Sequence, residues 1–194
     1  MSILSFALML LAAPAASPMV PASPPPPAPV ADAVPLTAEG WGPLRIGMTE
    51  AEVVAALGPD NDPEAVGGPE PESCDQWTPA RAPADMLVMI EEGRLTSIWL
   101  IDDARVRTDR GLGLGATAGQ VRQTYGGAVR ARPHMYQGDG AEYLTIWSHG
   151  GATGQEEWVE SQDARGIRYE TNEQGVVTTI GVGGPSIQYV EGCA

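Results

Sequence analysis

The alternation of apolar and polar residues predicts two β-hairpins in this chain. Residues 86–101 (MLVMIEEGRLTSIWLI) and 166–182 (GIRYETNEQGVVTTIGV) each contain two runs of strand-forming residues around a short turn at Gly93 or Gly175. Because side chains alternate along a strand, aligning these two glycines gives both hairpins a common core face. The residues expected on the core face are Thr96, Ile98, Leu100, Thr178, Ile180 and Val182. The residues expected on the opposite face are Leu95, Ser97, Trp99, Val177, Thr179 and Gly181.

Three further segments are predicted as strands. Residues 142–149 (EYLTIWSH) alternate in the same way, with Leu144 and Ile146 directed toward the core. The residues expected on the other side of this strand are Tyr143, Thr145, Trp147 and His149. The two shorter candidates are residues 72–77 and 186–190, the second being a closing strand near the C-terminus.

Two short helices are predicted upstream of these strands. Each begins with the spacing of a capping box, in which two residues three positions apart exchange side chain to backbone hydrogen bonds. The capping pairs are Thr49 with Glu52 and Thr117 with Gln120. Glycines at 58 and 126 are expected to end the helices, because glycine permits the left-handed closing conformation.

The order of these elements predicts an α+β fold of two tandem units, residues 41–104 and 110–194, each a short helix followed by an antiparallel meander. Helices of about eight residues are marginal in isolation, so they must pack against another element. Both helices are therefore expected on one face of the sheet.

The first 40 residues are expected to lie outside this domain. Residues 1–16 join an apolar run to small residues, which is typical of a secretory signal peptide and predicts a periplasmic or secreted protein. The run is shorter than the roughly 20 residues that span a bilayer, so an uncleaved anchor is the disfavoured alternative and the mature chain is expected to lack an integral membrane segment. Residues 17–40 are rich in Pro and Ala and predict a disordered linker.

The entry into the first helix resembles that of a known family. The residues concerned are Ile46, Gly47, Met48, Thr49, Val53 and Gly58, similar to the Gly-Met-Thr entry of outer-membrane assembly lipoproteins of the SmpA/OmlA type. The doubled unit resembles the tandem layout of β-lactamase inhibitory proteins, and the ending YVEGCA resembles those of uncharacterised exported bacterial proteins. The chain departs from the lipoproteins in having no lipobox cysteine. The resemblance implies a fold used for protein–protein contact in the cell envelope, and fold alone does not assign a chemistry.

The charge of the chain excludes one large class of partners. The formal net charge is -14, and all 11 basic residues are arginine. A chain this acidic repels phosphate backbones, so nucleic-acid binding is not expected.

The two cysteines, Cys74 and Cys193, are predicted to form a disulfide, because an even pair in an exported chain is normally oxidised. Closing a loop this long stabilises a fold by about 4 to 5 kcal/mol in the chain-entropy model. A catalytic redox role is the alternative, although neither cysteine lies in a Cys-x-x-Cys motif.

The sequence carries no pattern that indicates catalysis, a metal site or a cofactor. The spacing of His134 and His149 is not that of a metal-ligand pair, and the acidic segment 58–75 lacks the central Gly and final Glu of a calcium loop. We therefore predict no catalytic residue, no metal and no cofactor. The competing hypothesis is a hydrolase of an envelope polymer that uses spaced carboxylates. Its candidate carboxylates are Glu156, Glu157 and Glu160.

The aromatic residues give the strongest functional signal. Trp99, Tyr143 and Trp147 fall on the predicted non-core side of the sheet, and such side chains are enriched at interfaces. We therefore predict an exported, non-enzymatic binding or structural module that contacts a protein or another envelope component through an exposed sheet face. Two alternatives stay open: loops or the other unit cover this face, or the aromatics stack on sugar rings in a carbohydrate-binding module.

Overall fold

The computed structural model describes residues 33–65, 68–151 and 158–193. The predicted signal peptide and residues 17–32 of the predicted linker lie outside the described residues, as do Glu156 and Glu157.

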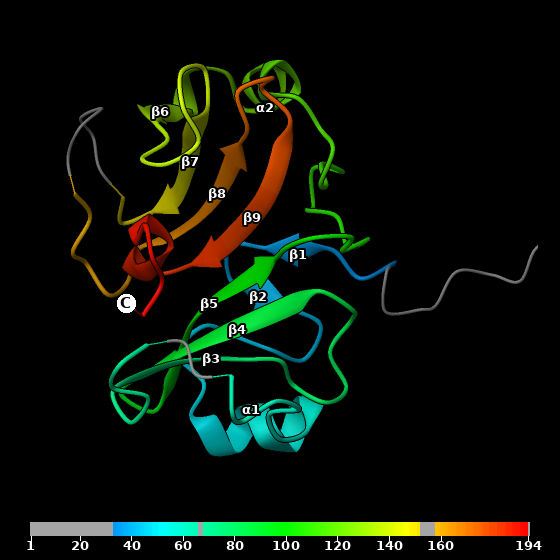
Figure 1. The fold of residues 1–194 in the computed structure, drawn as a ribbon, viewed down its shortest axis with the longest axis vertical. Helices are drawn as coiled ribbons and strands as arrows, with labels where there is room; N and C mark the ends of the chain where they lie inside the picture. Colours follow the sequence, from blue (N-terminus) through cyan, green and yellow to red (C-terminus); the bar gives the residue numbers. More distant parts are fainter. Residues whose placement is uncertain (1–32, 66–67, 152–157, 194) are drawn as a thin grey trace, which may run out of the picture.

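A seven-stranded antiparallel sheet forms the centre of the protein (Figure 1). Its strands are β3 (Cys74–Trp77), β4 (Met86–Glu91), β5 (Arg94–Leu100), β6 (Arg130–Pro133), β7 (Glu142–His149), β8 (Arg165–Thr171) and β9 (Val177–Gly183). They are arranged in the order β3-β4-β5-β9-β8-β7-β6, so that β5 and β9 pair in the middle and join the first half of the chain to the second. The predicted strands at 72–77 and 142–149 are confirmed as β3 and β7.

The two helices are α1 (Glu50–Leu57) and α2 (Ala118–Tyr125). Both predicted capping boxes are confirmed: the Thr49 N–H donates to Glu52 Oε2 at 2.8 Å, and the Thr117 N–H donates to Gln120 Oε1 at 2.8 Å. The expected glycines follow each helix with a positive φ that favours glycine, 87° at position 58 and 56° at position 126, but their ψ angles of 172° and -133° differ from the predicted left-handed helical conformation. Local sequence therefore determines both ends of each helix.

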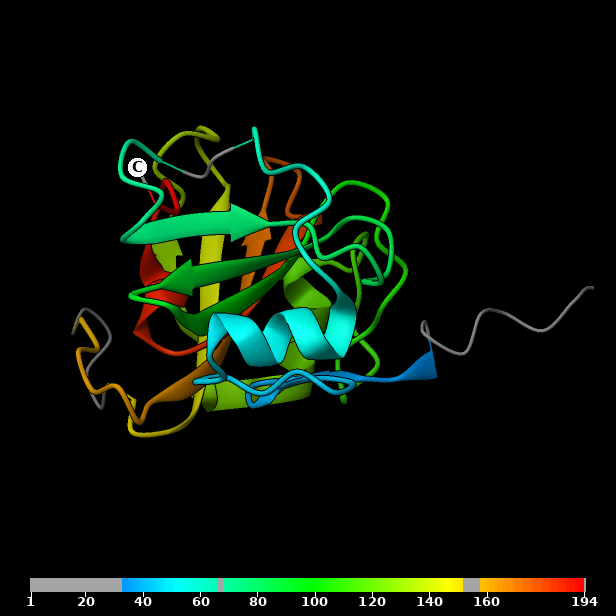
Figure 2. The same cartoon turned by 90° about the horizontal axis from the view of Figure 1, so that it is seen from below.

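Both helices pack on one hydrophobic core. Val53 and Leu57 of α1 and Val121 of α2 are buried in the same cluster as Ile98 and Ile180 from the central strands. Figure 1 shows α1 beside the strands of the first half and α2 beside those of the second, and Figure 2 shows α1 lengthwise from below. The fold is thus a mixed α+β structure with an antiparallel sheet and two short helices.

Two β-bulges change the predicted core face. Thr96 is an extra residue in β5, because Ile90 pairs with Leu95 whereas Met89 pairs with Ser97. Thr178 is an extra residue in β9 in the same way, at the register shift between Glu170 and Thr171. A bulge reverses the alternation beyond it, so Leu95 and Val177 join the core and their predicted outward orientation is wrong. The core positions expected beyond the bulges are confirmed: Ile98, Leu100, Ile180 and Val182.

The folded domain begins before the predicted boundary at residue 41. Leu36 and Ala38 are buried in the core, and two short strands, β1 (Leu36–Thr37) and β2 (Gly40–Trp41), pair with each other. The Leu36 N–H also donates to the Arg107 carbonyl at 2.8 Å. Residues 34–40 therefore belong to the domain, and the predicted linker extends too far. The Pro and Ala content of the segment indicated a linker, although the segment also contains a leucine that is buried in the fold.

The C-terminal residues 184–193, called the C-terminal strap below, cross the sheet face opposite the helices. The segment predicted as a closing strand instead contains a 3-10 helix, η3 (Pro185–Gln188), which Pro185 at its first turn favours. The strap ends in a disulfide between Cys193 and Cys74 of β3, which confirms the predicted pair.

Candidate functional site

Trp99 does not form part of an exposed surface. Its side chain is only 8% exposed and lies over Gly181, its direct neighbour on β9, where a β-carbon would come within 2.5 Å of the ring. The indole N–H donates to the buried Ser97 hydroxyl at 2.8 Å. Trp99 faces away from the helices as predicted, but it packs against the protein itself.

Tyr143 is also covered, with 7% of its surface exposed. The Arg168 guanidinium lies 3.6 Å above its ring, and the His134 ring lies 4.2 Å away on centroids. Trp147 is half-buried over Gly166, its partner on β8. The prediction of an open aromatic sheet face is therefore wrong for Trp99 and Tyr143, because the strap and the loop after β6 cover this side.

Arg168 links the strap to the sheet. This buried guanidinium donates from Nη1 to the carbonyls of Ile187 and Tyr189 at 2.8 and 3.2 Å. Its Nε lies 3.0 Å from Glu170 Oε1, in a geometry that makes an ion pair without an aligned hydrogen bond. Burial lowers the pKa of Arg168, and the charge of Glu170 opposes that effect. This arrangement fixes the backbone that carries Tyr189.

Three aromatic side chains and the neighbouring Val190 form what we call the exposed aromatic surface. The aromatic members are Tyr136, Trp158 and the half-buried Tyr189. They surround a shallow hollow whose remaining lining comes from the strap. Tyr136 is 64% exposed and Trp158 is 46% exposed. The Trp158 and Tyr189 rings are stacked, with centroids 6.3 Å apart and planes at 11°. Tyr136 is held by a hydrogen bond from its hydroxyl to the Glu191 carboxylate, which raises the pKa of Tyr136.

Sequence reasoning missed this surface because its members lie in loops. The aromatic residues that it selected were chosen by their alternation along strands. Tyr136 and Trp158 lie outside any strand, and their spacing in the chain gives no sign that they meet. One signal was available for Tyr136 and Trp158: they lie outside the predicted strands, so they have no place on a predicted core face. Tyr189 lies within the predicted strand at 186–190 and carries no such signal.

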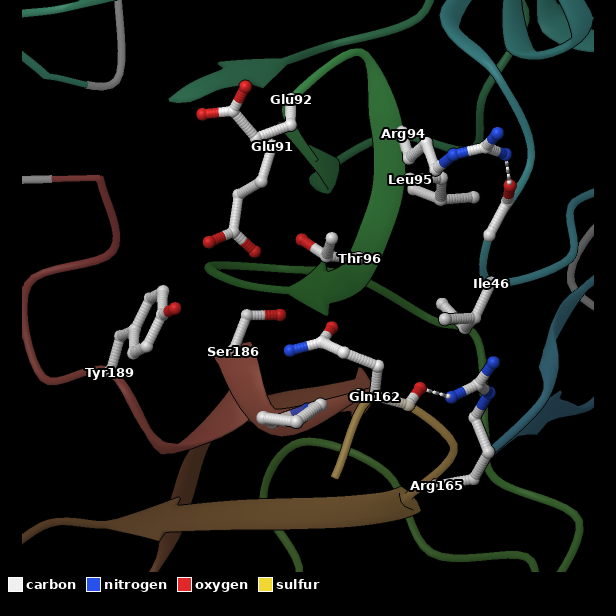
Figure 3. A pocket seen from close by; sticks show the side chains of 13 residues that line it. Ile46, Glu91, Glu92, Arg94, Leu95, Thr96, Gln162, Arg165, Ser186 and Tyr189 are labelled. Atoms are coloured by element: carbon white, nitrogen blue, oxygen red, sulfur yellow. Dashed lines mark hydrogen bonds between the residues drawn. The ribbon is translucent and has the colours of Figure 1, made fainter. Parts of the chain in front are cut away.

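A cavity of about 400 Å³ lies beside the strap and is lined by the start of β5, the segment before α1 and the strap itself (Figure 3). We call it the strap cavity. Figure 3 shows Glu91, Thr96, Gln162 and Ser186 directed toward a common space. Tyr189 lines this cavity as well as the hollow of the aromatic surface.

Ser186 is the most unusual group in the strap cavity. It is 2% exposed, and its hydroxyl has no hydrogen-bond partner among the described residues. At the far wall, Arg94 donates to the Gly47 carbonyl at 2.9 Å and Arg165 donates to the Gln162 carbonyl at 2.8 Å. Burial raises the pKa of Tyr189, and the Glu91 carboxylate beside it adds to this effect.

The polar side chains in the lining of the strap cavity are hydroxyls, carboxylates, one amide and two guanidinium groups. The lining of the strap cavity contains no histidine, so Ser186 has no base of that kind beside it. Across the described ranges, no cluster of three or more His, Cys, Asp or Glu side chains has the geometry to hold a metal ion. His134 lies 3.5 Å from Glu170, and His149 lies 3.6 Å from Glu39 at the surface. No helix in the part of the chain that the structure describes is long and apolar enough to span a membrane.

No protein-family model and no curated protein sequence matches the chain. Among solved structures, the chain has a similarity to an extracellular protein containing a SCP domain from Bacillus anthracis, at 12% sequence identity and a TM-score of 0.42. The alignment covers 72% of this chain and 44% of that one, so the chain spans less than half of that protein's length. A similarity this low does not establish a shared fold or function.

Proposed function

We propose that this chain is an exported, non-enzymatic binding module that docks a protein partner through the exposed aromatic surface. The observation that carries the proposal is the gathering of aromatic side chains around one hollow: Tyr136 and Trp158 are exposed, and Tyr189 of the strap is half-buried. A monomeric protein rarely leaves such a cluster uncovered. Trp and Tyr are also the residues that contribute most to binding when a partner buries them.

The surroundings of the aromatic surface favour a basic partner. Glu191 lies in the lining of the hollow, and the whole chain has a formal net charge of -14. A partner with arginine or lysine around an apolar centre would be attracted to this surface, and added salt would slow its association.

The surface is also arranged so that it loses little entropy on binding. Tyr189 is carried by backbone that Arg168 holds, Trp158 stacks on Tyr189, and Tyr136 is fixed by Glu191. Aromatic rings that are already held in place pay less to be ordered in a complex. This preorganisation supports binding of a specific partner over non-specific hydrophobic association.

An extracytoplasmic location is part of the proposal. It is supported by the disulfide between Cys74 and Cys193, since such bonds persist in oxidising compartments. The apolar run of residues 1–16 supports the same location through its resemblance to a signal peptide.

The proposal further includes a tandem origin of the two halves. Its support is that each helix entry makes the same hydrogen bonds to the hairpin that follows. The N–H to carbonyl pairs of the first half are Gly47 to Leu95, Leu95 to Met48 and Glu50 to Gly93, and those of the second are Gly115 to Val177, Val177 to Ala116 and Ala118 to Gly175. The bulges at Thr96 and Thr178 occupy matching positions in these hairpins. Independent evolution of two units would have no reason to repeat such details.

Site-specific crosslinking in cells tests the docking surface. Val190→p-benzoyl-phenylalanine introduces a photo-crosslinker at the hollow, and Gln123→p-benzoyl-phenylalanine introduces one on the exposed side of α2 as a matched control. We expect one defined, basic protein to be crosslinked from position 190 and not from position 123. Equal products at both positions would contradict the assignment.

A glycan array separates a protein partner from a carbohydrate. The purified protein is not expected to bind the array through the aromatic surface. Binding that Trp158→Ala abolishes and Gln123→Ala retains would replace the protein partner with a sugar, because aromatic rings can also stack on sugar rings.

A further inference from the structure

The strap cavity contains a buried polar group that the protein leaves unmatched. The Ser186 hydroxyl is directed into the cavity and has no hydrogen-bond partner among the described residues. A buried hydroxyl without a partner destabilises the folded protein, and native structures keep few of them. The cavity volume of about 400 Å³ lies within the range of small-molecule sites. Both observations indicate a ligand that supplies the missing hydrogen bond.

The charges around the cavity are separated. Carboxylates from Glu91 and Glu92 lie at the end of β4 and the following turn, whereas the guanidinium groups of Arg94 and Arg165 lie toward the opposite wall (Figure 3). The charged groups in the lining sum to zero, but they leave a negative side and a positive side. Such an arrangement is complementary to a molecule that carries both charges.

We propose that the strap cavity binds a small zwitterion with a free ammonium group and a free carboxylate, such as an amino acid or a dipeptide. An ammonium group has three N–H donors, and the carboxylate of Glu91 with the hydroxyls of Thr96 and Ser186 offers three acceptors on one side. The carboxylate of the ligand lies on the side of Arg165 and Arg94, whose guanidinium groups favour carboxylates. Arg165 Nε also lies 3.7 Å from Glu39 Oε2, so the ligand shares this guanidinium with Glu39.

The remaining walls suit the body of such a ligand. Ile46 and Leu95 supply apolar surface between the two charged sides, and Gly47 and Gly184 allow close approach of the backbone. The Thr96 hydroxyl makes only a long contact, 3.4 Å to the Met89 carbonyl, so it can reorient toward a ligand. The site is separate from the exposed aromatic surface except for Tyr189, and it does not depend on the proposed protein partner.

Isothermal titration calorimetry with four probes tests the ligand class. The probes are alanine, alanyl-alanine, N-acetyl-alanyl-alanine and alanyl-alanine amide. Alanine or alanyl-alanine is expected to bind, and each capped dipeptide is expected to bind at least about tenfold more weakly than alanyl-alanine, because each cap removes one charge. Failure of both free probes to bind, or equal affinity for the capped and free dipeptides, overturns the proposal.

Ser186→Ala distinguishes ligand recognition from a structural role. It removes a hydroxyl that has no partner among the described residues, so the unliganded variant is expected to be at least as stable as the wild type, while its affinity for the better free probe falls about tenfold or more. Ser148→Ala, at an exposed position on β7, serves as the control and should change neither quantity. Unchanged affinity in Ser186→Ala would show that this hydroxyl does not contact the probe.

Glu91→Gln provides a second, independent variant. It removes the negative charge proposed to face the ammonium group while keeping the shape of the side chain. In this variant the ratio of the affinities for alanyl-alanine and N-acetyl-alanyl-alanine should fall at least about fivefold. The ratio of the affinities for alanyl-alanine and alanyl-alanine amide should stay as in the wild type. Loss of both discriminations together, or of neither, contradicts the assigned orientation.

Discussion

Gly181→Ala is expected to destabilise the protein by crowding Trp99. The substitution adds one methyl group on β9, and that β-carbon would lie 2.5 to 2.7 Å from three atoms of the indole ring. Ordinary carbon contacts are near 3.5 to 4.0 Å, so the ring must move by about 1 Å. It cannot do so freely, since it is buried and its N–H donates to Ser97 at 2.8 Å.

The expected cost of this crowding is about 1 to 3 kcal/mol, the usual range for an added methylene in a packed region. A smaller opposing gain of about 0.5 to 1 kcal/mol arises because alanine restricts the unfolded chain. The net loss relative to the wild type should therefore be about 0 to 2.5 kcal/mol, and the loss relative to a glycine-to-alanine control about 1 to 3 kcal/mol, measured as the free energy of unfolding in urea with tryptophan fluorescence as the signal. Gly127→Ala is the control, because its β-carbon would meet nothing within 4 Å. A Gly181→Ala protein as stable as this control would refute the packing of Trp99 described above.

Three further predictions concern stability. Trp99→Ala should lower the free energy of unfolding by about 3 to 5 kcal/mol, measured in urea, because it removes a buried aromatic side chain; a loss below 1 kcal/mol would mean that the ring is exposed. Replacing both Cys74 and Cys193 by serine should lower it by up to about 5 kcal/mol, from the closure of a loop with a sequence separation of 119 residues, and an unchanged denaturation midpoint would contradict this. Acidification should weaken α1, because the hydrogen bond from the Thr49 N–H to the Glu52 carboxylate lowers the pKa of Glu52. The stability that this carboxylate contributes is complete above the ordinary carboxyl pKa and is lost as the pH falls through the lowered pKa of Glu52. Glu52→Gln should thus lose less stability than the wild type between about pH 7 and pH 3, and equal losses would exclude this carboxylate as a contributor.

The parts of the fold that local chemistry determines could be predicted from the sequence. The spacing of Thr49 and Glu52 predicts where helix α1 begins, because capping hydrogen bonds join residues three positions apart. The glycine at position 58 predicts where it ends. Strand β7 followed from simple alternation in the same way. The disulfide between Cys74 and Cys193 could be inferred because the chain offers no other pair.

The remaining features depend on contacts between distant residues. The bulge at Thr96 arises from how β5 registers against β4, and no local pattern shows that one residue is extra. The cover over Tyr143 comes from Arg168 and the strap, residues that approach it only after the chain has folded. For the same reason alternation selected the correct side of the sheet for Tyr143 but could not reveal whether that side is open.

The exposed aromatic surface is the part of the candidate site that could least be predicted from the sequence. Tyr136, Trp158 and Tyr189 come from three separate segments, and each is polar enough at one end to be unremarkable in a loop. Only their proximity in the folded protein makes them a candidate binding surface. Aromatic residues outside regular elements therefore warrant as much attention in such chains as those on predicted strands.

The central claim, that the exposed aromatic surface docks a protein partner, is tested most directly by an affinity measurement. The partner identified by crosslinking is purified, and its affinity for the Trp158→Ala protein is compared with its affinity for the wild type. Trp158 is stacked on Tyr189 and half-exposed at the rim of the hollow, so its removal should weaken binding about 30-fold or more without a comparable loss of stability. Gln123→Ala should bind as the wild type does. A Trp158→Ala protein that binds the partner with wild-type affinity would contradict the proposed docking surface.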